Sequence, residues 1–297
     1  MVCKNMCAVD FEFVIRNKSD LFIMTNLFQD DVFRLLNTYY KQEYYMVDDL
    51  CKDLHISPKL LPKIPNEIIY KLEFDDSLSV VENALIYKTL QRLKKLMLDG
   101  SYSKRLKNVN IDTLNVFQKA FSLNNVFCAQ CSFIPMGSVM DLFTDLLKSD
   151  DYRKEFMNLP KSIRENSYYR SIFKYQWCLK NYDKLKDKDF CKQYVYNCFS
   201  AQNFIPVPMG MMSGQARIDF HTLLKSVKCC KFDFIQKFGD FFKSHRIGMG
   251  FKDFLKETNL EVFYNDCDLS KMSLEDFNEL LNKRSDLILE KLNAQYS

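Results

Sequence analysis

A three-residue segment, Phe-Ile-Pro, occurs twice in this chain and constrains its fold more than any other feature. The longer copy lies within residues 203–210, where prolines stand at 206 and 208. Each proline fixes its own φ and biases the preceding residue toward extended backbone, so the pattern predicts a stiff extended strip over 204–208. The shorter copy is 133–135, and both copies are followed by Met-Gly, an aspartate and Leu-Leu-Lys-Ser, with different gaps. Two copies indicate either a scaffold built twice or one site lined twice.

Composition narrows the class of protein. Glycine is scarce, with 7 residues in 297, against a usual share of about 7%. Few backbone positions can then need positive φ, which favours helices and argues against a glycine-cradled phosphate site. The 11 cysteines are odd in number and irregularly spaced, so we expect reduced, mostly buried thiols. No apolar run reaches the roughly 18 residues of a membrane span, and no signal segment is evident, so we expect a cytoplasmic protein without a membrane partner.

Helical periodicity dominates the chain. Apolar residues at steps of three and four predict a helix that Ser79 caps and Gly100 ends, and further helices over 168–179 and 187–199. Similar stripes cover 31–54 and 112–123. Alternation at 10–15 and 21–24 allows a small β element near the N-terminus. The predicted fold class is therefore mainly α, an irregular helical bundle with room for that small element.

The last predicted helix carries one unusual residue. Ser273 can cap it, and one face would hold Leu274, Phe277, Leu281, Arg284, Ile288 and Leu292. Only Arg284 interrupts this apolar face. A guanidinium in such a position usually snorkels to water or finds a carboxylate, so a structural role is favoured over a functional one.

Charge is distributed unevenly and suggests two regions. Acidic residues predominate over 1–87, whereas basic residues predominate over 88–107 and 216–256, and the net charge is +4. A polar stretch near 101–111 would divide an acidic, helical N-terminal region (1–105) from a helical region with both Phe-Ile-Pro copies (106–297), unless the two form one continuous domain. The basic segments are either solvated helix faces or a surface for a protein or nucleic acid.

Candidate site residues lie around and after the second copy. The candidate binding residues are Asn203, Arg217, Asp219, His221, His245 and Arg246. Imidazole and guanidinium groups suit acid–base work or phosphate contact, and Asn203 either caps the preceding helix or reaches into a cleft. Cys128 and Cys131 have the spacing of a redox pair, but zinc would need other ligands to converge on them. We assign no catalytic residue, no metal and no cofactor.

The C-terminal third resembles a set of uncharacterised bacterial proteins with an Asn-Phe-x-Pro-x-Pro loop and a terminal Arg-bearing helix. The residues that carry the likeness are 203–210, Arg217, Asp219, 238–241, 250–255, Asn259, Leu260 and 283–286. The resemblance implies an intracellular bacterial protein that could come from a mobile element. It supplies no established activity.

Two hypotheses about function follow. The first is a binding or regulatory protein that uses the basic segments and the loop 203–219. The alternative is an enzyme acting on nucleic acid or nucleotide, with the histidines and arginines of the candidate set as its polar groups. Convergence of those side chains in one cleft would favour the enzyme, and their dispersal over a convex surface would favour the binding protein.

Overall fold

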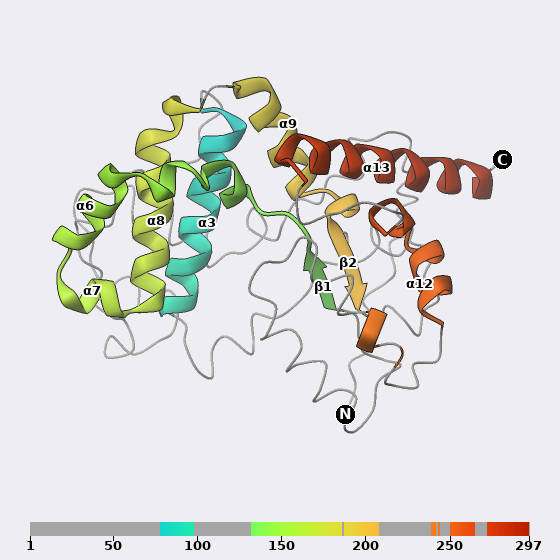
Figure 1. Ribbon diagram of the computed structural model, residues 1–297, viewed down its shortest axis with the longest axis horizontal. Helices are drawn as coiled ribbons and strands as arrows, with labels where there is room; N and C mark the ends of the chain where they lie inside the picture. Colours follow the sequence, from blue (N-terminus) through green and yellow to red (C-terminus); the bar gives the residue numbers. More distant parts are fainter. Residues whose placement is uncertain are drawn as a thin grey trace, which may run out of the picture.

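The computed structural model describes residues 78–97, 132–185, 187–207, 239–241, 243, 250–264 and 272–296. In these residues the chain is mainly α-helical, as its periodicity predicts, with one short ribbon of two strands. Figure 1 shows α3, α6, α7 and α8 on one side, the ribbon with α12 and α13 on the other, and α9 between them. No helix in this part of the chain is long and apolar enough to cross a membrane.

The elements follow one another in a simple order. The helices are α3 (Val80–Met97), α6 (Asp150–Asn158), α7 (Lys161–Glu165), α8 (Ser167–Asn181), α9 (Lys188–Cys198), α12 (Phe251–Glu257) and α13 (Leu274–Tyr296). The strands are β1 (Ser132–Pro135) and β2 (Phe204–Val207). Short 3-10 turns are η4 (Val139–Phe143), η5 (Leu146–Lys148), η6 (Tyr182–Lys184), η7 (Ala201–Asn203) and η9 (Glu261–Phe263).

The predicted helix starts at Ser79 and Ser273 are confirmed. Ser79 Oγ accepts the Glu82 N–H (3.2 Å), and the Glu82 carboxylate accepts the Ser79 N–H (3.0 Å), which closes a capping box at α3. Ser273 and Asp276 make the same exchange at α13, over 3.0 and 3.3 Å. Asp187 caps α9 through its side chain. These contacts satisfy backbone donors that a helix start leaves without an intrahelical partner.

The first group of helices is held by the packing of α3 along α8 and α9. Leu85 of α3 and Ile172 and Cys178 of α8 are fully buried. A buried hydrogen bond of 3.0 Å runs from Gln176 Nε2 on α8 to Thr89 Oγ1 on α3. A helix from the predicted N-terminal region therefore packs directly against helices that follow the first Phe-Ile-Pro copy.

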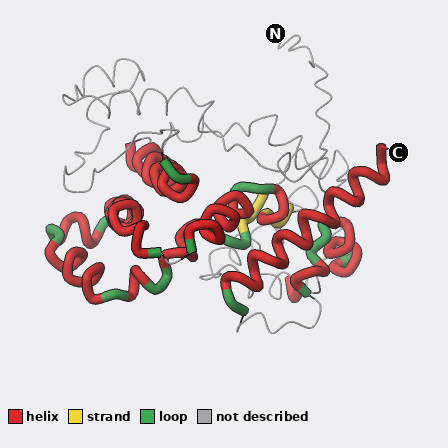
Figure 2. The backbone as a smooth tube through the Cα atoms, turned by 90° about the horizontal axis from the view of Figure 1, so that it is seen from above, coloured by secondary structure: helices red, strands yellow, loops and turns green. Residues whose placement is uncertain are grey.

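The two Phe-Ile-Pro copies meet in space, because β1 and β2 pair with each other in antiparallel fashion. The register pairs Ser132 with Val207, Phe133 with Pro206, Ile134 with Ile205 and Pro135 with Phe204. The extended strip predicted over 204–208 is thus confirmed for Phe204–Val207. Figure 2 shows this ribbon, in yellow, close to the long helix α13. The two copies therefore form a single two-stranded sheet.

Pro135 of β1 and Pro206 of β2 occupy positions where the ribbon loses no hydrogen bond. The Met136 N–H donates to the Asn203 carbonyl (2.8 Å), one residue beyond the paired strands. Hydrogen-bonded and non-hydrogen-bonded pairs alternate along an antiparallel ladder, so the pairs that contain Pro135 and Pro206 fall at the non-hydrogen-bonded positions. A residue without an N–H is tolerated there.

Several predictions fall on residues that the structure does not describe. They are the β element at 10–15 and 21–24, the helices at 31–54 and 112–123, and the boundary near 101–111. Each Phe-Ile-Pro copy is followed by a similar segment, 141–149 after the first and 219–226 after the second. Residues 141–149 contain 3-10 turns of η4 and η5 rather than an α-helix. Whether the two copies arose by duplication stays a hypothesis.

The predicted apolar face of the last helix is confirmed except at Leu274, which is half-buried. Phe277, Leu281, Arg284, Ile288 and Leu292 of α13 are all buried, with at most 1% of each residue exposed. Burial of the four apolar side chains fixes α13 on the rest of the fold, since each contributes about 1.5–3 kcal/mol. Arg284 is buried among them and needs a separate account.

We expect Leu281→Ala to lower the free energy of unfolding by about 2–5 kcal/mol, because it opens a cavity beneath α13. Leu287→Ala, on the same helix at a residue that is 39% exposed, is the matched control and should cost under about 1 kcal/mol. Urea unfolding followed by circular dichroism measures both. Equal losses for the two variants would contradict this placement of α13.

Candidate functional site

The structure describes one of the six candidate binding residues, Asn203. The other five, Arg217, Asp219, His221, His245 and Arg246, lie outside the described residues, as do Cys128 and Cys131. Their convergence in one cleft is therefore not tested. Among the described residues, three polar side chains from the motifs of the C-terminal third, Asn203, Arg284 and Ser285, lie in the interior.

Asn203 joins the ribbon to the end of α9. It is 0% exposed. Its Oδ1 accepts the Gly137 N–H (2.7 Å), and its Nδ2 donates to the Gly137 carbonyl (3.0 Å) and to the Cys198 carbonyl (2.9 Å). The side-chain amide thus pairs with Gly137 as a strand residue would, and it also satisfies a carbonyl at the end of α9. Of the two roles expected for Asn203, capping of the preceding helix is the one the geometry supports.

Gly137 is a glycine because there is no space for a side chain. A Cβ at this position would lie 2.7 Å from Tyr194 Oη, 2.8 Å from Phe277 Cε1 and 3.2 Å from Asn203 Oδ1. Tyr194 and Phe277 are fully buried and cannot move aside. The absence of a side chain lets the backbone approach the Asn203 amide closely.

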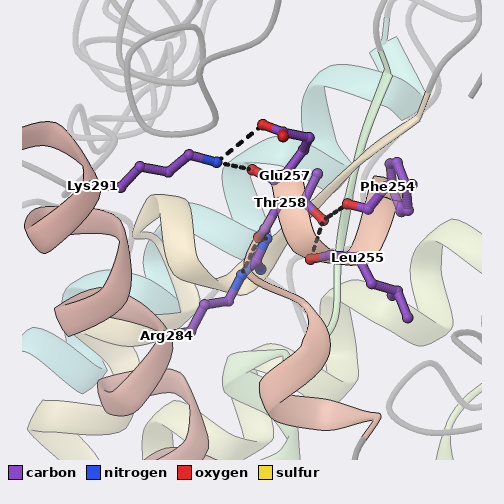
Figure 3. A network of polar contacts seen from close by, with 6 residues as sticks. All are labelled: Phe254, Leu255, Glu257, Thr258, Arg284 and Lys291. Atoms are coloured by element: carbon purple, nitrogen blue, oxygen red, sulfur yellow. Dashed lines mark hydrogen bonds and ion pairs between the residues drawn. The ribbon is translucent and has the colours of Figure 1, made fainter. Parts of the chain in front are cut away.

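Arg284 of α13 ties three segments together from inside the protein. It is 0% exposed, and Figure 3 shows its guanidinium pointing at the end of α12. Nε and Nη2 donate to the Thr258 carbonyl (3.1 and 2.8 Å), and Nη1 donates to the carbonyls of Gln202 (2.7 Å) and Phe204 (3.0 Å). The guanidinium therefore does not snorkel to water; its fork engages main-chain carbonyls at the end of α12, in η7 and in β2. Burial lowers the pKa of Arg284 to about 9, so the group stays cationic at neutral pH.

The end of α12 is shaped to meet these cations. Asn259 has φ 52°, and the Leu260 N–H donates back to the Leu255 carbonyl (2.8 Å), as in a Schellman motif. Lys291 Nζ donates to the Glu257 carbonyl (3.0 Å) and pairs with its carboxylate (3.1 Å), as Figure 3 also shows. Positive groups at a helix C-terminus are stabilising. The Asn259-Leu260 pair in the sequence motif thus has a structural explanation.

A pocket of about 480 Å³ opens where the first turns of α9 and α13 face η4. Four carboxylates line it: Asp141, Asp145, Asp187 and Glu275. The apolar part of the lining consists of Leu142, Leu185, Phe190, Cys191, Met272 and Leu274. No lysine, arginine or histidine belongs to the lining. The pocket lining therefore combines apolar side chains with four carboxylates.

The carboxylates are at this place because helices begin here. Asp187 caps α9, Glu275 lies in the first turn of α13, and Asp141 closes a capping box at η4. Asp145 makes an exposed ion pair with Lys148 (3.4 Å). Helix N-termini favour negative side chains, so three starts that converge also gather negative charge.

Tyr194 connects this pocket to the ribbon. Its Oη donates to Asp141 Oδ2 (2.8 Å), which also accepts the Ser138 N–H (2.8 Å). Tyr194 is 0% exposed, and burial is the main reason its pKa is raised. The hydroxyl therefore keeps its proton and serves as a donor at any physiological pH.

Cys191 is the cysteine of the pocket lining. It is buried and has a free thiol. Burial, together with the negative charge of Asp187, raises its pKa. A thiol becomes reactive when its pKa is lowered, so Cys191 serves as apolar lining. No group of three or more His, Cys, Asp or Glu side chains among the described residues could hold a metal ion.

Sequence reasoning did not find this pocket. The signals were present as separate caps: Ser273 was identified, and the predicted helix over 187–199 implied an acidic start. What the sequence lacks is the information that the starts of α9, α13 and η4 lie side by side, since Asp141 and Glu275 are far apart in the chain.

We expect Gly137→Ala to destabilise the fold by about 1–3 kcal/mol, because the added methyl overpacks a buried contact. Gly250→Ala is the matched control, since a Cβ there would meet only the movable carboxylate of Asp253, and it should cost less than about 1 kcal/mol. Chemical unfolding curves give both values. A Gly137→Ala protein as stable as the wild type would show that the backbone of Gly137 is not clasped as described.

We expect Arg284→Met to cost at least about 3 kcal/mol, because it leaves buried carbonyl oxygens without their donor. Lys283→Met, at the exposed neighbouring residue, should change stability by less than about 0.5 kcal/mol. Unfolding followed through the single tryptophan, Trp177, and through circular dichroism compares the two. A loss below about 1 kcal/mol for Arg284→Met would argue against its role as a staple.

Comparison with known proteins leaves the site to be judged on its geometry. The chain matches no family model, no curated protein and no solved structure. The resemblance of its C-terminal third to uncharacterised bacterial proteins therefore stays a prediction.

Proposed function

We propose that this chain is a binding or regulatory protein of the cytoplasm and that its pocket between α9 and α13 takes a basic side chain of a partner protein. The observation that carries the proposal is the lining of the pocket, in which four carboxylates lie beside apolar side chains. The three described cysteines, Cys178, Cys191 and Cys198, are buried free thiols, which suits a reducing compartment.

The lining complements one kind of group. Lysine and arginine side chains carry an apolar stem and a charged end, so the stem can lie on Leu142, Phe190 and Leu274 while the cation meets the carboxylates. A phosphate group would be repelled by the same carboxylates. The pocket thus favours a protein partner over a nucleic acid at this position.

The carboxylates of the pocket also have contacts within the protein. Asp187 and Asp141 accept backbone N–H groups at helix starts, and Asp145 contacts Lys148 at the surface. A carboxylate can accept several hydrogen bonds, and a hydrogen bond between charged groups is about twice as strong as a neutral one. A basic group in the pocket would add to these contacts rather than replace them.

The other hypotheses depend mainly on residues outside the described part of the chain. An enzyme acting on nucleic acid or nucleotide would depend on the histidines and arginines at 217–246, and nucleic-acid binding would depend on the basic segments 88–107 and 216–256. If the chain binds duplex DNA in a salt-sensitive manner, and if this binding survives loss of the pocket carboxylates, these other hypotheses would be favoured.

We expect N-acetyl-arginine amide to bind the wild-type chain more tightly than N-acetyl-norleucine amide, which has a similar stem without the charge. The variant Asp187→Asn/Glu275→Gln should weaken binding of the arginine probe by roughly two- to five-fold per carboxylate removed. Asparagine is as good an N-cap as aspartate, so α9 should keep its start. Calorimetric or NMR titration measures the affinities, and added salt should weaken binding of the charged probe.

Asp189→Asn is the matched control, because it removes a carboxylate from the exposed face of α9 outside the pocket lining. It should leave the affinity unchanged. Equal binding of the two probes, or equal losses for the control and the pocket variant, would overturn the proposal.

A further inference from the structure

One residue of the pocket lining is connected to the contacts that hold the ribbon. Asp141 lines the pocket, and its Oδ2 accepts a hydrogen bond from the Tyr194 hydroxyl. The Tyr194 ring also stacks on Phe190, a second lining residue, with ring centroids 6.1 Å apart. On its other side, Tyr194 Oη lies 2.7 Å from the place where a Cβ on Gly137 would be. One buried side chain thus contacts two residues of the pocket and the residue that Asn203 clasps.

We infer that Tyr194 is the positioning residue of the pocket: it sets the Asp141 carboxylate for a bound cation and couples occupancy of the pocket to the Gly137–Asn203 contact. This inference rests on the proposed function of the same pocket. Two donors, the Tyr194 hydroxyl and the Ser138 N–H, both act on Oδ2, so they fix the plane of the carboxylate. Tyr194 is fully buried and cannot touch the ligand itself.

The coupling has a direction that follows from linkage. A cation that contacts Asp141 restricts the motion of this carboxylate, and the Tyr194 hydroxyl that donates to it is then held more firmly in place. Its hydroxyl packs against Gly137, whose N–H donates to Asn203 Oδ1 over 2.7 Å. The pocket and the clasp must then stabilise each other to the same extent.

The test is a double-mutant cycle on the affinity for N-acetyl-arginine amide. Tyr194→Phe, which removes only the hydroxyl, should weaken binding by about two- to five-fold in the wild-type background. In the Asp141→Ala background the same change should have no further effect on affinity, because Tyr194 acts through that carboxylate. A loss of equal size in both backgrounds, or none in the wild type, would overturn the inference.

A second measurement needs no substitution and so does not depend on how well the variants fold. The probe should slow hydrogen exchange of the Gly137 amide more than that of the Thr258 amide, which lies at the end of α12, away from the pocket. Equal slowing at the two amides would indicate general stabilisation and would contradict the coupling.

The outcomes separate this inference from the proposed function. Binding that depends on Asp187 and Glu275 but not on Tyr194 would leave the pocket as a basic-group site and remove only the role of Tyr194. Failure of the wild type to prefer the arginine probe over the norleucine probe would overturn both.

Discussion

The buried guanidinium of Arg284 is the contact on which the arrangement of α12, α13 and the ribbon depends. Its donors meet carbonyl oxygens of two separate segments, those of Gln202 and Phe204 in one and that of Thr258 in the other. Burial of a cation is costly unless its donors are satisfied. The hydrogen bonds from Arg284 to these carbonyls must therefore form together when the protein folds. The apolar face of α13 supplies the packing free energy, and the guanidinium decides which backbone segments lie against it.

The ribbon and the pocket are two sides of one construction. Asn203 holds Gly137 in place, Gly137 leaves room for Tyr194, and Tyr194 orients Asp141 at the pocket. Asn203 and Arg284 are thus used inside the protein, and three of the four carboxylates of the pocket belong to helix starts. Because these buried polar groups have a structural role, the carboxylates of the pocket are the groups that we propose contact a partner.

The sequence predicted the local elements well and the contacts between distant segments poorly. Capping residues such as Ser79 and Ser273, the face of α13 and the extended strip at the second Phe-Ile-Pro copy depend on neighbouring residues, which a sequence displays directly. The sequence showed that the two Phe-Ile-Pro copies are alike, but it did not show that they pair, because pairing and register depend on backbone hydrogen bonds between distant residues. The partners of Arg284 were missed, since main-chain carbonyls leave no mark in a sequence. The pocket was missed for the same reason: it is made where three helix starts converge.

The central claim is that the two Phe-Ile-Pro copies form one ribbon in a single register, and NMR tests it most directly. Residues of a non-hydrogen-bonded antiparallel pair have Cα atoms only about 4.5 Å apart. We therefore expect strong Hα–Hα nuclear Overhauser effects between Pro135 and Phe204 and between Phe133 and Pro206. Their absence, or effects that link Pro135 to Ile205 instead, would contradict the register and with it the account of Asn203, Arg284 and the pocket.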